Sequence, residues 1–299
     1  MTTMFQPNVT ALHEKAMLVK LTTRRANLNR RDTEAEAVLQ ATLGDAGLTA
    51  NRKLFRDKHN PINQMMTAVS EVYTYHREHT LPYIDKGPRI LPNTQYDDYT
   101  KAMRERIDNL DGLMQRHLPQ YALYVQMDID YRSGGAAATT KRANVADYPT
   151  VDQFKASMGF DLRFSPLPDA KHFLFDISDH DMQVFMDAQA DALRAANEDV
   201  VLRMLEPLQH LVAKLGRPIG TEGSVFRDSA VQNVTDGLEM ARRLAIDPSP
   251  ALLALMDGLH QDLAKLNTTW LRESPTARHD AARRLDQIAR QMGGFMQAL

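Results

Sequence analysis

Apolar and polar residues recur along this chain at spacings that predict helices over most of its length. The first helix is rather polar, extends from Thr10 to about Thr42 and ends at Gly44, and a second begins at Pro61. A third covers about residues 96–127 and bends at Pro119, where a proline removes a backbone hydrogen bond. The buried positions of the second helix are predicted to be Ile62, Met65, Met66, Val69, Val72 and Tyr73.

The C-terminal half predicts a further series of helices. Thr150 and Gln153 have the spacing of a capping box for a short helix. Ser178 is the predicted N-cap of a long helix that Pro207 kinks or ends. Proline-containing breaks then separate three helices, over about residues 228–246, 249–270 and 275–293, and Trp270 is expected on an apolar helix face.

Three segments depart from this helical pattern. Residues 81–94 hold three prolines and a glycine, which is typical of an ordered surface loop. Residues 131–146 contain a Gly-Gly step and no large apolar residue except Val145, which predicts a mobile connection. Residues 160–164 and 172–177 alternate apolar and polar positions on either side of a proline-rich turn, which predicts a small β-hairpin.

The predicted fold class is therefore mainly α (α+β), with long helices and one small β-hairpin. Residues 1–130 would form an N-terminal helical region with a basic arm, and residues 131–146 a flexible connection. Residues 147–299 would hold the hairpin and the C-terminal helices. All three parts could also belong to one compact domain, because a chain of 299 residues is long enough to bury a large core.

The composition excludes several kinds of site. With 43% hydrophobic and 25% charged residues the chain is typical of a globular protein, and it has no cysteine. Disulfides, thiolate metal sites and cysteine nucleophiles are thereby excluded, and a reducing cytosol is the expected compartment. No apolar run approaches the roughly 18 residues that span a bilayer, and the first residues lack a signal-peptide core. We therefore expect a cytoplasmic protein with no membrane segment.

Charge is distributed unevenly, although the formal net charge is only -2. Residues 1–60 carry +4 and residues 146–200 carry -7, whereas residues 61–145 are neutral and residues 201–299 carry +1. Binding of a polyanion depends on the local charge rather than on the total. The basic N-terminal region is therefore compatible with a nucleic-acid partner.

No motif predicts catalysis or a metal centre. Glu71, His76 and His79 share a helical segment but lack the rest of a zinc or di-metal motif. The acidic group at residues 176–181 could hold a hard cation, but acids at the start of a helix also favourably meet its dipole. The glycine-rich loop at 216–224 lacks the Gly-Lys-Ser/Thr of a phosphate-binding loop. We expect a protein that is not an enzyme and that holds no metal or cofactor.

Two basic clusters carry the clearest chemical signal, and such clusters neutralise phosphates. On a helix, the cations of the first cluster would form a stripe that can follow a nucleic-acid backbone. The alternative is that they pair with Glu34, Glu36 and the acids of the -7 segment. The clusters are Lys20, Arg24, Arg25, Arg30 and Arg31, and, around Phe55, Arg52, Lys53, Arg56, Lys58 and His59.

Aromatic residues lie beside several cations. Single-stranded nucleic acid is bound by such a mixture, because bases stack on aromatic rings while Lys and Arg hold phosphates. A tyrosine on an apolar helix face can equally belong to the core. The predicted DNA-contacting set is Lys20, Arg24, Arg25, Arg30, Arg31, Arg52, Lys53, Arg56, Lys58, Tyr73, Tyr75, Arg132, Lys141 and Arg142.

Three stretches resemble a phage and bacterial family whose function was long unknown. They are residues 87–92 (GPRILP) followed by Tyr96, residues 147–149 (DYP), and residues 164–168 (FSPLP) with Phe173. Over about residues 60–205 the chain is most similar to the single-stranded-DNA-binding RNA polymerase cofactors of lytic podoviruses. The resemblance implies a helical fold that is not an OB-fold, a preference for single strands and a role in phage transcription or replication. Its matching positions form turns, so it assigns no DNA-contacting residue.

These observations predict a non-catalytic, phage-type single-stranded-DNA-binding protein that works with a phage RNA polymerase or with replication proteins. Lys and Arg of the first 60 residues and of the 131–142 arm would hold phosphates, while exposed Tyr or Phe stack on bases. The alternative is an adaptor for a phage polymerase or ATPase, without direct DNA binding, whose acidic middle and Gly293–Met296 tail bind the partner. We expect a homo-oligomer, because long amphipathic helices often bury their apolar stripe against another subunit.

Overall fold

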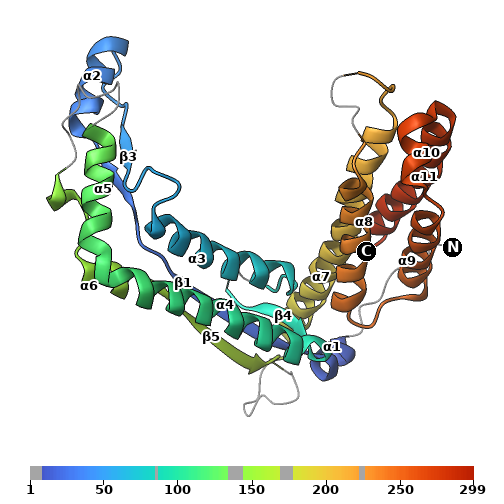
Figure 1. Cartoon of the computed structure of the whole chain (residues 1–299). Coiled ribbons are helices and arrows are strands. Elements are labelled where there is room, and N and C mark those ends of the chain that lie inside the picture. The colour runs from blue at the N-terminus through green and yellow to red at the C-terminus, as the bar shows by residue number, and fades with distance from the viewer. Residues whose placement is uncertain (1–8, 85–86, 134–143, 169–177, 222–225) are drawn as a thin grey trace. The chain divides into compact units, whose positions relative to one another are not determined.

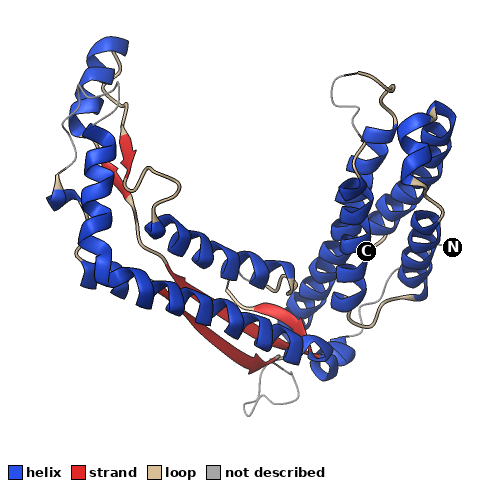
Figure 2. Cartoon of the chain, viewed as in Figure 1, coloured by secondary structure: helices blue, strands red, loops and turns tan. Residues whose placement is uncertain are grey.

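The structure, a computed structural model, describes residues 9–84, 87–133, 144–168, 178–221 and 226–299. It is mainly helical with two small β-sheets, which confirms the predicted fold class (Figure 1, Figure 2). One sheet has the strand order β4 (Arg89–Pro92), β1 (Ala16–Arg24) and β5 (Gly159–Pro166), and the other pairs β2 (Asn29–Arg31) with β3 (Asn51–Lys53). No helix in this described part is both long enough and apolar enough to cross a membrane.

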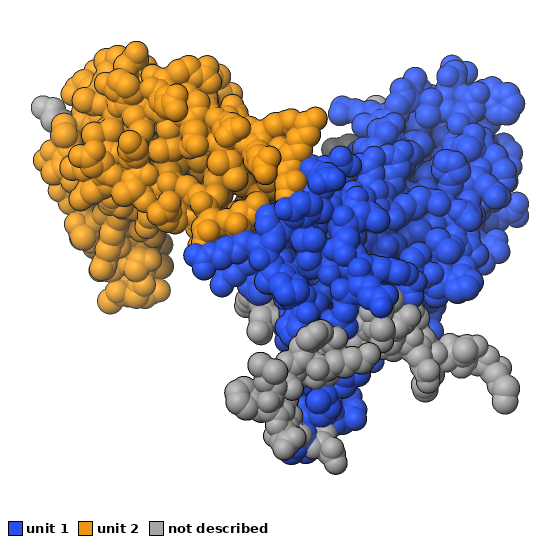
Figure 3. Space-filling model, turned by 90° about the horizontal axis from the view of Figure 1, so that it is seen from below, with its two compact units in different colours: residues 1–20, 77–99, 163–299 blue, residues 21–76, 100–162 orange. Residues whose placement is uncertain are grey.

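The chain forms two compact units, each assembled from segments that are distant in sequence (Figure 3). Unit 1 consists of residues 1–20, 77–99 and 163–299, and unit 2 of residues 21–76 and 100–162. Each unit has its own core of buried apolar side chains. The units therefore do not follow the order of the three regions predicted along the chain.

Unit 1 is a bundle whose longest helix is α7 (Asp179–Leu215). As predicted, the hydroxyl of Ser178 caps it, accepting a hydrogen bond from the backbone N–H of Asp181. Buried Leu, Val and Met side chains of these helices, joined by Leu12 from α1 (Val9–Lys15), form one core. The other helices of the bundle are α8 (Asp228–Leu244), α9 (Pro250–Ala264), α10 (Thr268–Glu273) and α11 (Pro275–Gln297).

Two helices of unit 1 approach closely at Gly237 of α8. A Cβ atom there would lie 2.4 Å from the carbonyl oxygen of Arg203 in α7. That carbonyl is also the one that loses its helical donor, because Pro207, four residues on, has no N–H. The helix nevertheless continues through Pro207 to Leu215, so the proline does not end it. A glycine on α8 thus leaves room for the backbone of α7 beside its proline.

Sequence patterns placed three C-terminal features of unit 1 wrongly. The helix predicted for residues 249–270 is two helices, because α9 ends at Ala264 and Asn267 caps α10. Trp270 is not covered by the core: its side chain is 67% exposed. The residues of the predicted Gly293–Met296 tail lie inside α11, and Phe295 and Met296 pack against the core. They are therefore part of the bundle rather than an extended tail.

Unit 2 contains most of α3 (Pro61–Glu78) and α4 (Tyr96–His117), together with α5 (Tyr121–Ser133) and α6 (Val151–Ala156). The predicted bend at Pro119 is confirmed, since a short 3-10 turn separates α4 from α5. The predicted capping box of Thr150 and Gln153 is also confirmed at the start of α6. The unit is centred on an aromatic core of Phe55, Tyr121, Tyr148 and Phe154.

The prediction of one helix over residues 10–42 is wrong. Only α1 is helical before the chain enters β1, and α2 (Thr33–Leu43) begins after β2, with Asp32 as its N-cap. The segment Ala16–Arg24 contains Val19, Thr22 and Thr23, whose branched Cβ atoms favour strands. Its first residues pair in antiparallel register with β4, Ala16 opposite Pro92 and Val19 opposite Arg89. Long-range pairing thus prevails over a weak helical spacing.

Other local predictions also changed. Tyr73, expected in the core of the second helix, is exposed, whereas Ala68 and His76 are buried there. Residues 81–94 include strand β4 as well as loop. Only the first run of the predicted β-hairpin can be assessed: it forms β5, which pairs with β1, while residues 172–177 lie outside the described residues. Most of the predicted connection, residues 134–143, also lies outside them.

Candidate nucleic-acid interface

Residues of both basic clusters predicted from the sequence meet in unit 2 on one β-ladder. Strands β2 and β3 are antiparallel, with Arg30 opposite Arg52 and Asn29 opposite Lys53. The backbone N–H of Leu54 donates to the carbonyl of Leu28, which extends the ladder at the Asn29–Lys53 end. Arg24 and Arg25 precede β2, and Arg56 and Lys58 follow β3, so both groups leave the ladder at this same end.

Arg30 and Arg52 are directed to the inner side of the ladder, where they meet Asp147. Arg30 Nε donates to the Asp147 carbonyl oxygen at 2.9 Å, and the guanidinium of Arg52 forms an ion pair with the Asp147 carboxylate. Like charges directly opposite on paired strands repel. Asp147, which belongs to the acidic -7 segment, offsets that repulsion. Arg52 is therefore paired with an acid of that segment, as in the alternative interpretation, whereas Arg30 is held by a backbone carbonyl.

Arg31 is also held by an internal acid. Its Nε donates to both carboxylate oxygens of Glu36, at 2.8 and 2.7 Å. Glu36 is buried and accepts a further bond from the backbone N–H of Ala50. The Glu36 carboxylate thus links α2 to Ala50, the residue before β3, and Arg31 binds the same carboxylate. Arg31 therefore stabilises the fold of this region. It is a weaker candidate for a phosphate contact than its position in the cluster indicated.

A buried carboxylate holds the loop that carries the second cluster. Asp128 of α5, which is 1% exposed, accepts hydrogen bonds from the backbone N–H groups of Phe55 and Arg56 at 2.8 and 2.7 Å. The hydroxyl of Tyr148 donates to the same carboxylate at 2.6 Å. Phe55 has φ +51°, which is unfavourable for a residue other than glycine. Asp128 therefore stabilises a strained turn. In this turn the side chain of Phe55 packs in the core and that of Arg56 is exposed to solvent.

Four cations of unit 2 form the surface that we call the basic cluster: Arg24, Arg25, Arg56 and Lys58. All four are exposed, and among the residues that the structure describes none of their side chains has a hydrogen-bond or ion-pair partner. Lys53 is exposed beside them but does interact within the protein. Exposed cations that are not neutralised nearby are the side chains best able to bind phosphates. The basic cluster is thus the part of the predicted set that can bind an anion without losing an internal contact.

Gly159 shapes the position of one member of this cluster. A Cβ atom at residue 159 would lie 2.9 Å from the Arg24 guanidinium, and Gly159 has φ +147°, a conformation that side chains rarely allow. The guanidinium therefore lies against bare backbone at the start of β5. A larger residue here would displace the Arg24 side chain.

The aromatic candidates differ in their exposure. Tyr75 is covered by Arg106, whose guanidinium carbon lies 3.8 Å from the ring centroid, so this face is not free for a base. Tyr73 is exposed, but it lies 12 residues into α3, about 18 Å along the helix from Pro61. Tyr131, which is 57% exposed, follows Asp128 by one helical turn. In the sequence, only its position beside Arg132 indicated that Tyr131 could contact DNA. In the structure, the hydrogen bonds of Asp128 to the Arg56 loop place Tyr131, one turn later on α5, near that loop.

The remaining predicted residues contribute less. Lys20 is exposed but belongs to unit 1. Nothing is described for the side chain of Arg132, and Lys141 and Arg142 lie outside the described residues. In the described part of the chain no group of three His, Asp or Glu side chains is close enough together to hold a metal ion. Asp176 of the acidic group lies outside that part.

The hydroxyl of Tyr121, a residue of the aromatic core, donates to the Pro149 carbonyl at 2.9 Å. Burial raises the pKa of Tyr121 to about 12, although the charge of Arg30 acts in the opposite direction. The hydroxyl therefore stays protonated and donating well into the alkaline range.

Charge also differs between the units: unit 2 carries a formal +2 and unit 1 a formal -4.

In comparisons with protein-family models, curated proteins and solved structures, nothing matches this chain. Its function must therefore be inferred from its own side chains.

Proposed function

We propose that this chain is a non-catalytic single-stranded-DNA-binding protein that assists phage transcription or replication. The observation that supports this function most is the basic cluster, Arg24, Arg25, Arg56 and Lys58, which is exposed at one end of the β2–β3 ladder. Four cations there can bind successive phosphates of a flexible strand, whose atmosphere of counterions is released on binding. The sequence resemblance to the podoviral polymerase cofactors supports the same function.

A preference for single strands follows from the exposed aromatic side chain near this cluster. Tyr131 presents most of its surface to solvent, and an unpaired base can stack on its ring. In a duplex the bases are stacked and paired already, so this contribution is lost and only the phosphate contacts remain. A protein of this kind holds melted DNA open beside an RNA polymerase or at a replication fork.

Fluorescence anisotropy with a labelled single strand and its matched duplex tests this proposal. We expect tighter binding of the single strand, and a fall of log K with log salt of about 0.7 for each phosphate contact. Equal affinity for the two forms, or an affinity that does not depend on salt, would contradict the proposal. The titration should cover several salt concentrations on the full chain, so that the number of phosphate contacts is measured together with the preference.

A second candidate function, an adaptor that does not bind DNA, is favoured by an exposed apolar face. Leu123, Met127 and Tyr131 are exposed at successive turns of α5, and Val38, Leu39 and Leu43 are exposed on α2. Apolar surfaces of this kind often contact another protein or a second subunit. If neither oligonucleotide binds in the titration, the adaptor becomes the preferred function. Self-association stays a prediction.

A further inference from the structure

The single tryptophan of the chain lies on the surface of unit 1. Trp270 is 67% exposed, although a side chain of this size is usually largely buried. The backbone around it is fixed, because Asn267 Oδ1 accepts hydrogen bonds from the N–H groups of both Thr269 and Trp270. The indole ring is thus presented to solvent by an ordered, capped helix, α10. A large flat apolar surface held in this way can stack on a ligand.

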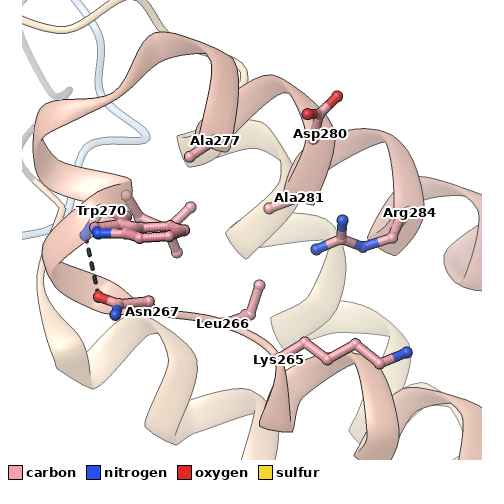
Figure 4. Close-up of a pocket in the computed structure, with 9 residues that line it drawn as sticks. Lys265, Leu266, Asn267, Trp270, Ala277, Asp280, Ala281 and Arg284 are labelled. Atoms are coloured by element: carbon pink, nitrogen blue, oxygen red, sulfur yellow. Dashed lines mark hydrogen bonds between the residues drawn. The ribbon is translucent and has the colours of Figure 1, made fainter.

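The indole forms one wall of a hollow of about 510 Å³ between the end of α9, α10 and α11. Leu266, Ala277 and Ala281 line it, and the small alanines leave space beside the ring. Figure 4 shows the Trp270 ring and the Arg284 guanidinium directed into the hollow from opposite sides. An apolar floor with charged groups at the edge is typical of sites for small organic ligands.

The charged groups at the edge favour an anion on the side away from the ring. Lys265 and Arg284 share one carboxylate, that of Asp262, at 3.3 and 3.8 Å. Both cations are largely exposed and still have N–H groups to donate. Asp280 also lines the hollow and lies 3.8 Å from Arg283. The edge therefore offers two cations that can still donate hydrogen bonds to an anion, and, in Asp280, one carboxylate that can accept a hydrogen bond.

We infer that this hollow binds one nucleotide of a single strand. Its base stacks on the Trp270 ring, and its phosphate is held by Lys265 and Arg284. Asp280 can accept a hydrogen bond from an amino or imino N–H group of the base. The inference rests on the proposed function for the choice of ligand, but it concerns a different surface from the basic cluster. A nucleotide has both a flat ring that can stack on Trp270 and an anion that can bind Lys265 and Arg284.

Tryptophan fluorescence reports this site directly, because Trp270 is the only tryptophan. We expect quenching when the full chain is titrated with a single-stranded oligonucleotide and, at higher concentration, with thymidine monophosphate. Replacing Arg284 with glutamine should weaken the quenching, whereas the same change at Arg290 of α11, an exposed arginine outside the hollow, should not. In anisotropy, Trp270→Ala should lower the affinity for the single strand by about 5- to 150-fold, the range for one stacked base, and Trp270→Phe should restore part of it.

The outcomes separate this inference from the proposed function. If a labelled single strand binds but the fluorescence of Trp270 does not change, the nucleotide site is refuted and the proposed function stands. If no oligonucleotide binds, the proposed function fails and thymidine monophosphate decides the site: quenching that Arg284→Gln weakens supports it, and no quenching refutes it. A peptide or protein occupant would likewise leave the fluorescence unchanged with both nucleic-acid probes.

Discussion

Replacing Asp128 with alanine is expected to destabilise unit 2 by about 3–5 kcal/mol. The substitution leaves the N–H groups of Phe55 and Arg56 and the hydroxyl of Tyr148 without their acceptor in a buried place. It also releases Phe55 from its positive φ, which the carboxylate stabilises. The loop that carries Arg56 and Lys58 should therefore open, and its core aromatic contacts should weaken.

Hydrogen exchange followed by mass spectrometry locates this effect. Peptides covering residues 52–60, 121–131 and 145–150 should exchange faster in Asp128→Ala, while peptides from α8, α9 and α11 in unit 1 should keep the exchange of the natural sequence. Asp130→Ala is the matched control, because Asp130 lies on the same helix but is exposed and bonds only to Gln126 among the described residues. Unchanged exchange in Asp128→Ala, or an equal change in the control, would show that the carboxylate does not hold this loop.

Removing the four charges of the basic cluster is expected to weaken single-strand binding by about two to three orders of magnitude in ~0.1 M salt. Each lost phosphate contact lowers the slope of log K against log salt by about 0.7, so Arg24→Gln, Arg25→Gln, Arg56→Gln and Lys58→Gln together lower it by about 3. The four side chains have no partner among the described residues, so we expect the fold to remain. Arg30, Arg31 and Arg52 are less suitable, because their loss breaks contacts with Asp147 and Glu36.

A matched variant separates this local effect from the change in net charge. Arg217, Arg227, Arg243 and Arg290 are exposed cations of unit 1, and their replacement by glutamine changes the total charge by the same amount. This variant should bind the single strand with little change and should keep most of the salt slope. If both quadruple variants lose the same affinity, binding depends on net charge and not on the basic cluster.

Local signals in the sequence predicted much of the helical architecture. Pro61 after Asn60, the capping box at Thr150 and Gln153, and the Ser178 cap each act through neighbouring residues, so each could be identified from a few positions. The helix predicted for residues 10–42 failed for the opposite reason. Strand β1 exists because it pairs with β4, whose residues come 70 or more positions later in the chain than their partners, and the spacing within one segment cannot show that pairing.

The candidate interface was predictable in its residue types but not in its arrangement. The sequence located both basic clusters, yet only the β2–β3 register places Arg30 opposite Arg52. Asp147 and Asp128 decide which cations are paired and where the Arg56 loop lies, and both come from distant segments. Trp270 shows the same limit, since a local apolar spacing does not reveal whether another element covers the ring. Contacts with residues distant in sequence thus determine which arginines stabilise the fold and which can bind a ligand.

Photochemical cross-linking of a single-stranded oligonucleotide that contains halogenated thymine bases would locate the bound strand on the protein. Peptides cross-linked to the full chain would be identified by mass spectrometry, with the matched duplex as a control. We expect cross-links within residues 21–31, residues 52–60 and the end of α5 at Tyr131, in addition to any at Trp270, and far fewer with the duplex. Cross-links confined to unit 1, or equal in number for the duplex, would contradict the assignment of single-strand binding to the basic cluster of unit 2.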